Sequence, residues 1–111
     1  MKKVEVLIDP CEMEQVKKAL IKIGIRRMAI SQVDEFESQK YHKVLYRGNE
    51  YMIDVVKEFK IELLVATDEE LTEVIEVIEK NTKAKPIGDR NIFVSPVEQV
   101  IQVGAHAAHS A

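Results

Sequence analysis

The stretch FKIELLVATDEELTEVIEVI, residues 59–78, changes its hydrophobic period part-way along, and this change decides the fold. From residue 59 to residue 65 apolar side chains occupy every second position, which predicts a β-strand with at least one buried face. Thr67 and Glu70 then form the pattern of a capping box, so we expect a helix to begin there. Apolar residues at helical spacing predict the inward face of that helix: Leu71, Val74, Ile75 and Ile78.

The first part of the chain has the same order of a strand followed by a helix. Alternating apolar residues predict a strand over residues 4–8. Asp9 is expected to accept hydrogen bonds from the first-turn amides, with Glu12 three residues on, and Pro10 suits the first helical position. The inward stripe of this helix and its glycine C-cap are predicted to be Met13, Val16, Leu20, Ile23 and Gly24.

Two further strands complete the fold. Residues 26–36 predict the second strand and residues 92–94 the fourth, so the element order is β-α-β-β-α-β. This order is typical of a ferredoxin-like α+β domain, in which two helices cover one face of an antiparallel sheet. We expect residues 1–111 to form this single domain. Because Leu63 and Leu64 are both apolar, the open face of the sheet is predicted to be buried against other copies, which makes a homo-oligomer.

Composition excludes several classes of protein. The 111 residues are 46% hydrophobic and 32% charged, with a net charge of -3, which indicates a globular protein without affinity for nucleic acid. No apolar run approaches the roughly 20 residues that span a bilayer, so no membrane insertion is expected. The opening MKKVEVLID lacks the apolar core of a secretory signal, and Cys11 is the only cysteine. These features predict a cytoplasmic protein.

Residues 37–54 form an insert between the second and third strands that is longer than a simple hairpin needs. It contains QKYHKVLYRGNEY, residues 39–51. The insert either extends the hairpin as a protruding β-ribbon or forms a mobile loop that docks onto a partner. Its candidate docking residues include the side-chain types that dominate interfaces: Lys40, Tyr46, Arg47, Glu50 and Tyr51.

Several segments together resemble one known family. They are MKKVEVLIDP, VKKALIKIGIR, QKYHKVLYRGNEY, FKIELLV and PIGDRNIFV, in this order and over nearly the whole chain. They are similar to segments of the PII signal-transduction (nitrogen regulatory) proteins. The resemblance implies a ferredoxin-like homotrimer that binds ATP or ADP between subunits, with Mg²⁺ and 2-oxoglutarate in many members. It also implies that residues 37–54 are the T-loop, which controls a target transporter or enzyme.

The same resemblance supplies candidate site residues. Gln39 matches a residue that helps to hold Mg²⁺ and 2-oxoglutarate, Glu62 matches an adenine-site residue, and the turn at residues 88–89 matches the phosphate side. The residues expected to bind the nucleotide or effector are Gln39, Glu62, Leu64, Gly88, Asp89 and Arg90. Tyr51 matches a tyrosine that is uridylylated in some members, and its alternative is an ordinary exposed or packing tyrosine.

Positions that are usually cationic in the family carry other residues here: Glu58, Asn91, Gln102 and Gly104. Glu35 and Glu37 stand where the family has glycines beside the phosphate path. Because charge-assisted contacts are the strong ones, these changes predict that ATP binds weakly and that 2-oxoglutarate adds little. Lys85 and Arg90 are candidates for partial compensation.

A second hypothesis is a ferredoxin-like trimer that binds or tolerates metal without sensing nucleotides. His106 and His109 have an HxxH spacing in a tail, residues 104–111, that is expected to be flexible. No nucleotide-binding, metalloprotease or nucleophilic motif occurs, so no enzyme activity is expected.

Overall fold

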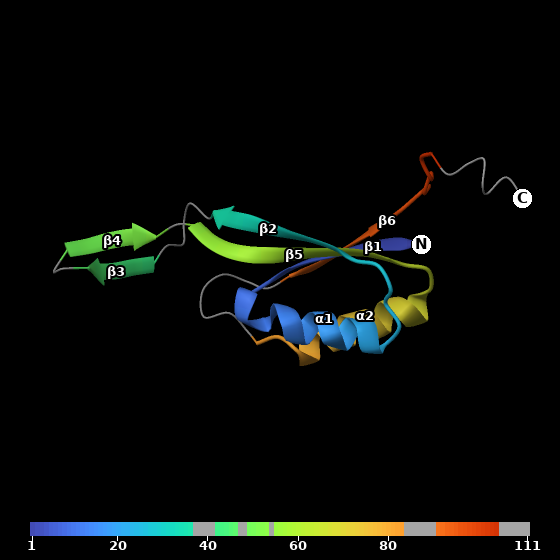
Figure 1. Cartoon of the computed structure of the whole chain (residues 1–111), viewed down its shortest axis with the longest axis horizontal. Helices are drawn as coiled ribbons and strands as arrows, with labels where there is room; N and C mark the ends of the chain where they lie inside the picture. Colours follow the sequence, from blue (N-terminus) through green and yellow to red (C-terminus); the bar gives the residue numbers. More distant parts are fainter. Residues whose placement is uncertain (37–41, 47–48, 54, 84–90, 105–111) are drawn as a thin grey trace, which may run out of the picture.

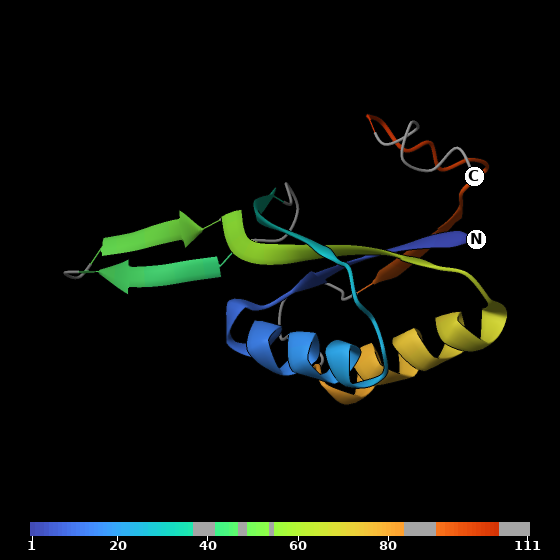
Figure 2. The ribbon, with the colours of Figure 1, turned by 45° about the vertical axis from the view of Figure 1, so that its right-hand side comes forward.

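The computed structural model describes residues 1–36, 42–46, 49–53, 55–83 and 91–104, and the side chains of these residues outside 37–54. Its four-stranded sheet has the order β2-β5-β1-β6, and every pairing is antiparallel. These strands are β1 (Lys2–Ile8), β2 (Ala29–Phe36), β5 (Val55–Val65) and β6 (Ile92–Pro96). The helices α1 (Met13–Lys22) and α2 (Asp68–Lys80) both lie on one face of the sheet (Figures 1 and 2). The predicted ferredoxin-like α+β fold is confirmed.

The core lies between the sheet and these two helices. β1 and β5 are its centre, because Val4 faces Leu63 and Val6 faces Ile61 across the antiparallel register. The buried apolar residues all come from the predicted strands and helices or their ends: Val4, Val6, Ile8, Met13, Val16, Leu20, Ile25, Ile61, Leu63, Val65, Val74 and Ile78. On α2 the prediction is partly wrong, since Val77 packs against this core in the place expected for Ile75.

The start of α2 confirms the predicted cap. The hydroxyl oxygen of Thr67 accepts from the Glu70 amide at 3.1 Å. The Glu70 carboxylate reaches one residue further back than the simplest capping box and accepts from the Ala66 amide at 2.8 Å.

The start of α1 differs from the prediction. Asp9 makes no side-chain cap hydrogen bond, because residues Pro10–Glu12 form a short 3-10 helix, η1, before α1 begins. The Asp9 carbonyl oxygen accepts from the Glu12 amide at 2.9 Å, so the backbone itself closes this turn. The Glu12 carboxylate instead accepts from the Lys83 amide at 2.8 Å and ties the start of α1 to the chain after α2.

The end of α1 is fixed by Gly24. Its φ of 103° lies in the left-handed region, which glycine adopts without a steric penalty. The Gly24 amide donates to Ile21 and the Ile25 amide donates to Leu20, which is the Schellman arrangement. The chain then runs through an irregular connection, so β2 begins at Ala29 and the predicted start at residue 26 is wrong.

The insert contains a two-stranded ribbon rather than a structureless loop. β3 (His42–Tyr46) pairs antiparallel with β4 (Asn49–Ile53), with Val44 opposite Tyr51. The ribbon projects beyond the end of the four-stranded sheet, on the left in Figure 1. Of the two alternatives predicted for the insert, its described backbone therefore adopts the protruding β-ribbon.

Candidate functional site

Four charged side chains lie together on the open face of the sheet, and we call them the charged quartet: Lys3, Glu5, Lys60 and Glu62. The Lys3 ammonium lies 2.9 Å from one oxygen of Glu62 and 3.2 Å from Glu5. The Lys60 ammonium lies 3.4 Å from the other oxygen of Glu62 and 3.7 Å from Glu5. Each carboxylate therefore meets two ammonium groups, and Glu62 is held in a fixed position on β5.

These contacts change the pKa of two members of the quartet, Lys3 and Glu62. The hydrogen bond from Lys3 is the main cause that lowers the pKa of the Glu62 carboxyl below its usual range. Hydrogen bonds to Glu62 and then to Glu5 raise the pKa of Lys3. The four side chains keep between 30% and 37% of their surface exposed, so water screens the pairs and their effect on stability is small. The quartet mainly orients Glu62.

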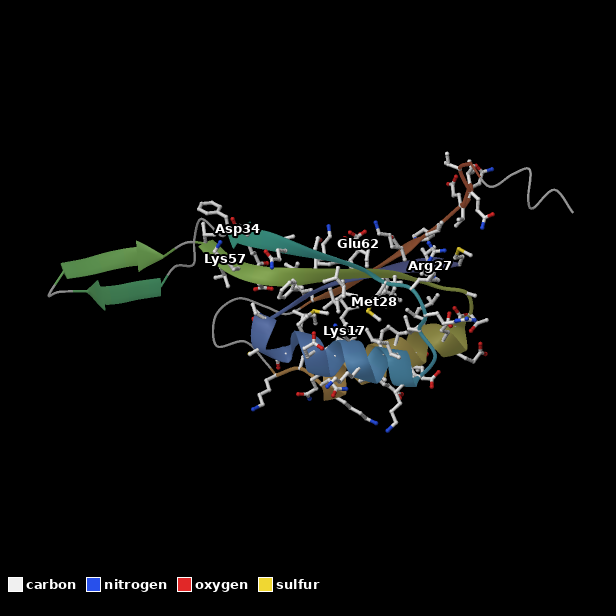
Figure 3. The ribbon with its side chains drawn as sticks, in the orientation of Figure 1. Lys17, Arg27, Met28, Asp34, Lys57 and Glu62 are labelled. Atoms are coloured by element: carbon white, nitrogen blue, oxygen red, sulfur yellow. The ribbon has the colours of Figure 1, made fainter. Side chains whose placement is uncertain are left out.

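A groove of about 620 Å³ lies at the end of the sheet where α1 connects to β2, and we call it the α1–β2 groove. Its size is within the range of small-molecule sites. The α1–β2 connection, β5, the first turn of α2 and the chain after β6 together supply its lining: Gly24, Ile25, Arg26, Arg27, Met28, Ala29, Glu62, Leu63, Leu64, Glu70 and Val100. In Figure 3, Met28 lies between the sheet and the helices, and Glu62 lies on the other side of the sheet.

Two of the predicted effector-binding residues line this groove. Glu62 supplies a carboxylate that the quartet orients, and Leu64 supplies an apolar side chain that is 45% exposed. The other predicted effector residues lie outside the described residues: Gln39, Gly88, Asp89 and Arg90. The structure therefore brings together the part of the predicted site that lies on β5.

The predicted docking residues lie on the ribbon or beside it. Tyr46 ends β3, and Glu50 and Tyr51 belong to β4, which places their backbones in the ribbon. Lys40 and Arg47 lie outside the described residues, as do His106 and His109 of the tail.

The positions that the resemblance gives as usually cationic in the family have different surroundings in this chain. Glu58 is buried, with 2% of its surface exposed, whereas Asn91, Gln102 and Gly104 are exposed. A second hollow, of about 390 Å³, lies near the base of the ribbon and has Pro10, Asp34, Lys57 and Phe59 among its lining residues. Lys57 lies 3.7 Å from Asp34 there (Figure 3).

An apolar strip borders the quartet and the groove. Phe93 stands beside Glu5 on β6, and Leu64 stands beside Lys3 on β5, so both share the open face with the quartet. We call Leu64 and Phe93 the apolar strip, and the chain after β6 adds further exposed apolar side chains: Val100, Ile101 and Val103.

Comparison with known proteins identifies the family. The family model described as nitrogen regulatory protein P-II matches residues 1–106. The nitrogen regulatory protein P-II of Porphyra purpurea is 41% identical over 111 residues, which cover 100% of this chain and 98% of that protein. The chain belongs to the P-II family.

Two bacterial P-II proteins agree with this assignment. Nitrogen regulatory protein P-II of Pasteurella multocida is 42% identical over 103 residues, covering 93% of this chain and 91% of that protein. Nitrogen regulatory protein GlnK of Escherichia coli is 39% identical over 111 residues, covering 100% of this chain and 98% of that protein. The resemblance that the sequence motifs indicated is confirmed.

Membership in the P-II family settles the broad class of function. The family consists of regulatory proteins, so this chain is a P-II-like signalling regulator and not an enzyme. Among the described residues, none of the helices is long and apolar enough to cross a membrane.

The α1–β2 connection was not predicted from the sequence. Residues 26–28 were assigned to a strand and given no role, whereas Arg26, Arg27 and Met28 line the groove beside Glu62. The available signal was the glycine C-cap at Gly24, because an irregular connection commonly follows the end of a helix.

The metal hypothesis gains no support from the described part of the chain. Within it, no group of three or more His, Cys, Asp or Glu side chains is close enough to hold a metal ion. P-II membership also favours the regulator over the metal-binding alternative.

Proposed function

We propose that this P-II-like regulator binds an adenine nucleotide in the α1–β2 groove and controls a target transporter or enzyme through residues 37–54. The observation that carries the proposal is that Glu62 and Leu64, which the family resemblance assigns to the nucleotide, line a groove of about 620 Å³. Leu64 offers an apolar surface to a base, and the oriented Glu62 carboxylate offers hydrogen-bond acceptors.

The proposal includes a cytoplasmic homotrimer built from single domains. Phe93 is 61% exposed and Leu64 is 45% exposed on the sheet face that the helices leave open. Burying this apolar strip against other copies is favourable, since apolar area removed from water contributes about 25 cal/mol per Å². In such a trimer a second copy would close the open side of the groove. Light scattering at several concentrations tests the trimer, and a monomeric mass at every concentration would contradict it.

Calorimetric titration with ADP tests the site. Leu64→Asn puts a polar group into the groove and is expected to weaken ADP binding at least about tenfold, since burying an unmatched amide costs about 1–3 kcal/mol. Ile21→Asn is the matched control, because Ile21 is an exposed apolar residue of α1 that does not line the groove. Equal ADP affinity in both variants would place the nucleotide elsewhere.

We also propose that ATP with Mg²⁺ binds weakly and that 2-oxoglutarate adds little. Asn91→Lys restores one of the expected cations at an exposed position and should strengthen ATP binding about tenfold, because a charge-assisted contact contributes about 1.5–3 kcal/mol. Glu58→Lys is less suitable as a single test, since Glu58 is only 2% exposed and a lysine there would bury an ammonium group. Unchanged ATP affinity in Asn91→Lys would show that the phosphate lies away from residue 91.

Docking through the ribbon is tested with the target itself once it is found, for example by retrieving proteins from a lysate with the intact chain. Deletion of residues 42–49 removes β3 and the turn and is expected to abolish retrieval while the oligomer remains intact. Arg47→Ala is expected to weaken target binding by about 1–3 kcal/mol, as central interface arginines do. Loss of the oligomer in the deletion would mean that the insert is structural.

A further inference from the structure

We infer that Arg27 covers one face of the nucleotide's base, so that the base lies between the Arg27 guanidinium group and Leu64. The inference rests on the proposed function and deepens it, because it names a base-binding residue that the family resemblance did not supply. Arg27 is exposed, lines the α1–β2 groove, and in Figure 3 lies beside the sheet at the end near the chain's N-terminus.

The register of β2 and β5 places Arg27 and Leu64 at the opening of the groove. Ala29 is the Cα partner of Glu62, and the pairing with β5 ends there because β2 begins at Ala29. Continued by two residues, the same register would bring Arg27 opposite Leu64, but both side chains line the groove instead. The groove thus opens where the connection leaves β5, with Arg27 on the side of the connection and Leu64 on the side of β5.

The Arg27 side chain is directed away from the core. Met28 packs against the core between the sheet and the helices, whereas its neighbours Arg27 and Ala29 are exposed. Within the described part of the chain, Arg27 takes part in no ion pair. Its guanidinium group is therefore available to a ligand in the groove.

The charges of the lining favour a neutral ring beside Arg27 over a phosphate group. Two arginines and two glutamates are the charged residues of the lining, and their formal charges cancel: Arg26, Arg27, Glu62 and Glu70. The Glu62 carboxylate repels a phosphate, whereas it can accept hydrogen bonds from the exocyclic amine of a base. The phosphate of the nucleotide is therefore expected to point away from residues 26–27.

Stacking is the contact that a guanidinium group offers to such a ring. The group is planar and weakly hydrated, so its face packs on an aromatic face with a favourable cation–π contribution. Nucleic-acid bases are bound in this way on arginine planes. Leu64, which is 45% exposed, supplies an apolar surface for the opposite face of the ring. The base then loses contact with water on both faces.

Three variants of Arg27 separate its plane from its charge. Arg27→Tyr keeps a planar face and loses the charge, Arg27→Lys keeps the charge and loses the plane, and Arg27→Gln loses both. Lys18→Gln is the control for the charge alone, because Lys18 is exposed on α1 and does not line the groove. Each protein is titrated calorimetrically with ADP and with adenosine, which lacks phosphate. Circular dichroism and light scattering establish that each variant keeps the fold and the assembly of the wild type.

Arg27→Gln is expected to lose about three- to thirtyfold in affinity, by the same factor for ADP and for adenosine, because the cation–π contact is lost. Arg27→Lys is expected to recover little of this loss, since an ammonium group has no planar face. Arg27→Tyr should stay within about threefold of the wild type, because aromatic rings also stack on bases. Lys18→Gln should stay within about twofold, since distant exposed charges are screened.

An NMR measurement on the wild type detects the stacking directly. Protons above the face of a base are shifted upfield by its ring current, so ADP and adenosine should shift the side-chain resonances of Arg27 upfield, whereas pyrophosphate should not. This shift decides the matter if Arg27→Tyr also loses affinity.

Three results would overturn the inference and leave the proposed function standing. They are an unchanged ADP affinity in Arg27→Gln, a loss confined to ADP with adenosine unaffected, and the absence of the upfield shift at saturating ADP. If neither ADP nor adenosine binds the wild type, the proposed ligand and the inference are both wrong.

Discussion

The four-stranded sheet and the β3–β4 ribbon are both antiparallel, yet they differ in what supports them. Every strand of the sheet belongs to a layer that two helices cover, and Ile61 at its centre is 1% exposed. The ribbon has two strands, and within the described part of the chain neither pairs with a further strand. Because an isolated two-stranded hairpin is marginally stable in water, the ribbon can reorder on a partner without cost to the core. The packed sheet and helices thus hold the groove proposed for the nucleotide, whereas the ribbon is the element proposed to dock onto a target.

Hydrogen exchange should give the largest difference between the two regions. Amides of residues 59–65 open only with much of the domain, whereas those of residues 42–46 and 49–53 need only local opening. We expect exchange in the ribbon to be at least about a thousandfold faster in the free protein, since global stability is typically 5–15 kcal/mol. Comparable protection in the two regions would mean that the ribbon is held by the rest of the assembly.

Mutations should show that the sheet and the ribbon contribute differently to the stability of the domain. Ile61→Ala removes a buried side chain between β5 and the helices and is expected to lower the free energy of unfolding by about 2–5 kcal/mol. Deletion of residues 42–49 is expected to leave the melting temperature nearly unchanged, because the core residues that the structure describes all lie outside the insert. Chemical denaturation measures the free energy of unfolding of both variants. If the deletion lowered it as much as Ile61→Ala does, the ribbon would contribute to the stability of the domain as the sheet does.

A smaller loss of stability is expected from a mutation at the start of α2, which borders the groove. Thr67→Ala removes the hydroxyl that accepts from the Glu70 amide and should lower stability by about 1 kcal/mol. Thr72→Ala is the control, since the Thr72 hydroxyl donates to the Asp68 carbonyl within the exposed face of the same helix and caps no terminus. Equal losses in the two variants would show that the cap has no special role.

The charged quartet should have the smallest effect on the stability of the domain. The pKa of Glu62 is lowered, so its contribution is present above the usual value of about 4.5 and is lost as pH falls below it. The pKa of Lys3 is raised, so its contribution is present below about 10.5 and is lost as pH rises above it. Lys3→Met should therefore move the Glu62 carboxyl back toward its usual pKa in an NMR titration. An unchanged Glu62 pKa would show that Lys3 does not orient it.

Local sequence rules predicted the elements whose hydrogen-bond partners lie close together in the sequence. Thr67 and Glu70 predicted the α2 cap because the pair needs only three residues of chain. Asp9 failed as a cap because backbone hydrogen bonding formed η1 instead, a choice that side-chain pattern does not encode. The β3–β4 pairing was left open because ribbon and loop share the same composition.

The groove could not be predicted from any one segment. It forms only when the α1–β2 connection, β5, the first turn of α2 and Val100 come together, and these are far apart in the sequence. The family resemblance supplied Glu62 and Leu64, but it contained no expectation for Arg26 or Arg27. Their position in the groove lining depends on the Schellman turn and on the packing of β5, both of which require the fold.

An NMR titration of the isotope-labelled protein with ADP locates the bound nucleotide without a mutation. We expect amide shift changes to concentrate at residues 24–29 and 62–64, which line the α1–β2 groove. Residues 15–22 of α1, which lie outside the groove lining, should change little. Shift changes that avoid both groove segments, at ADP concentrations that saturate binding, would contradict this expectation.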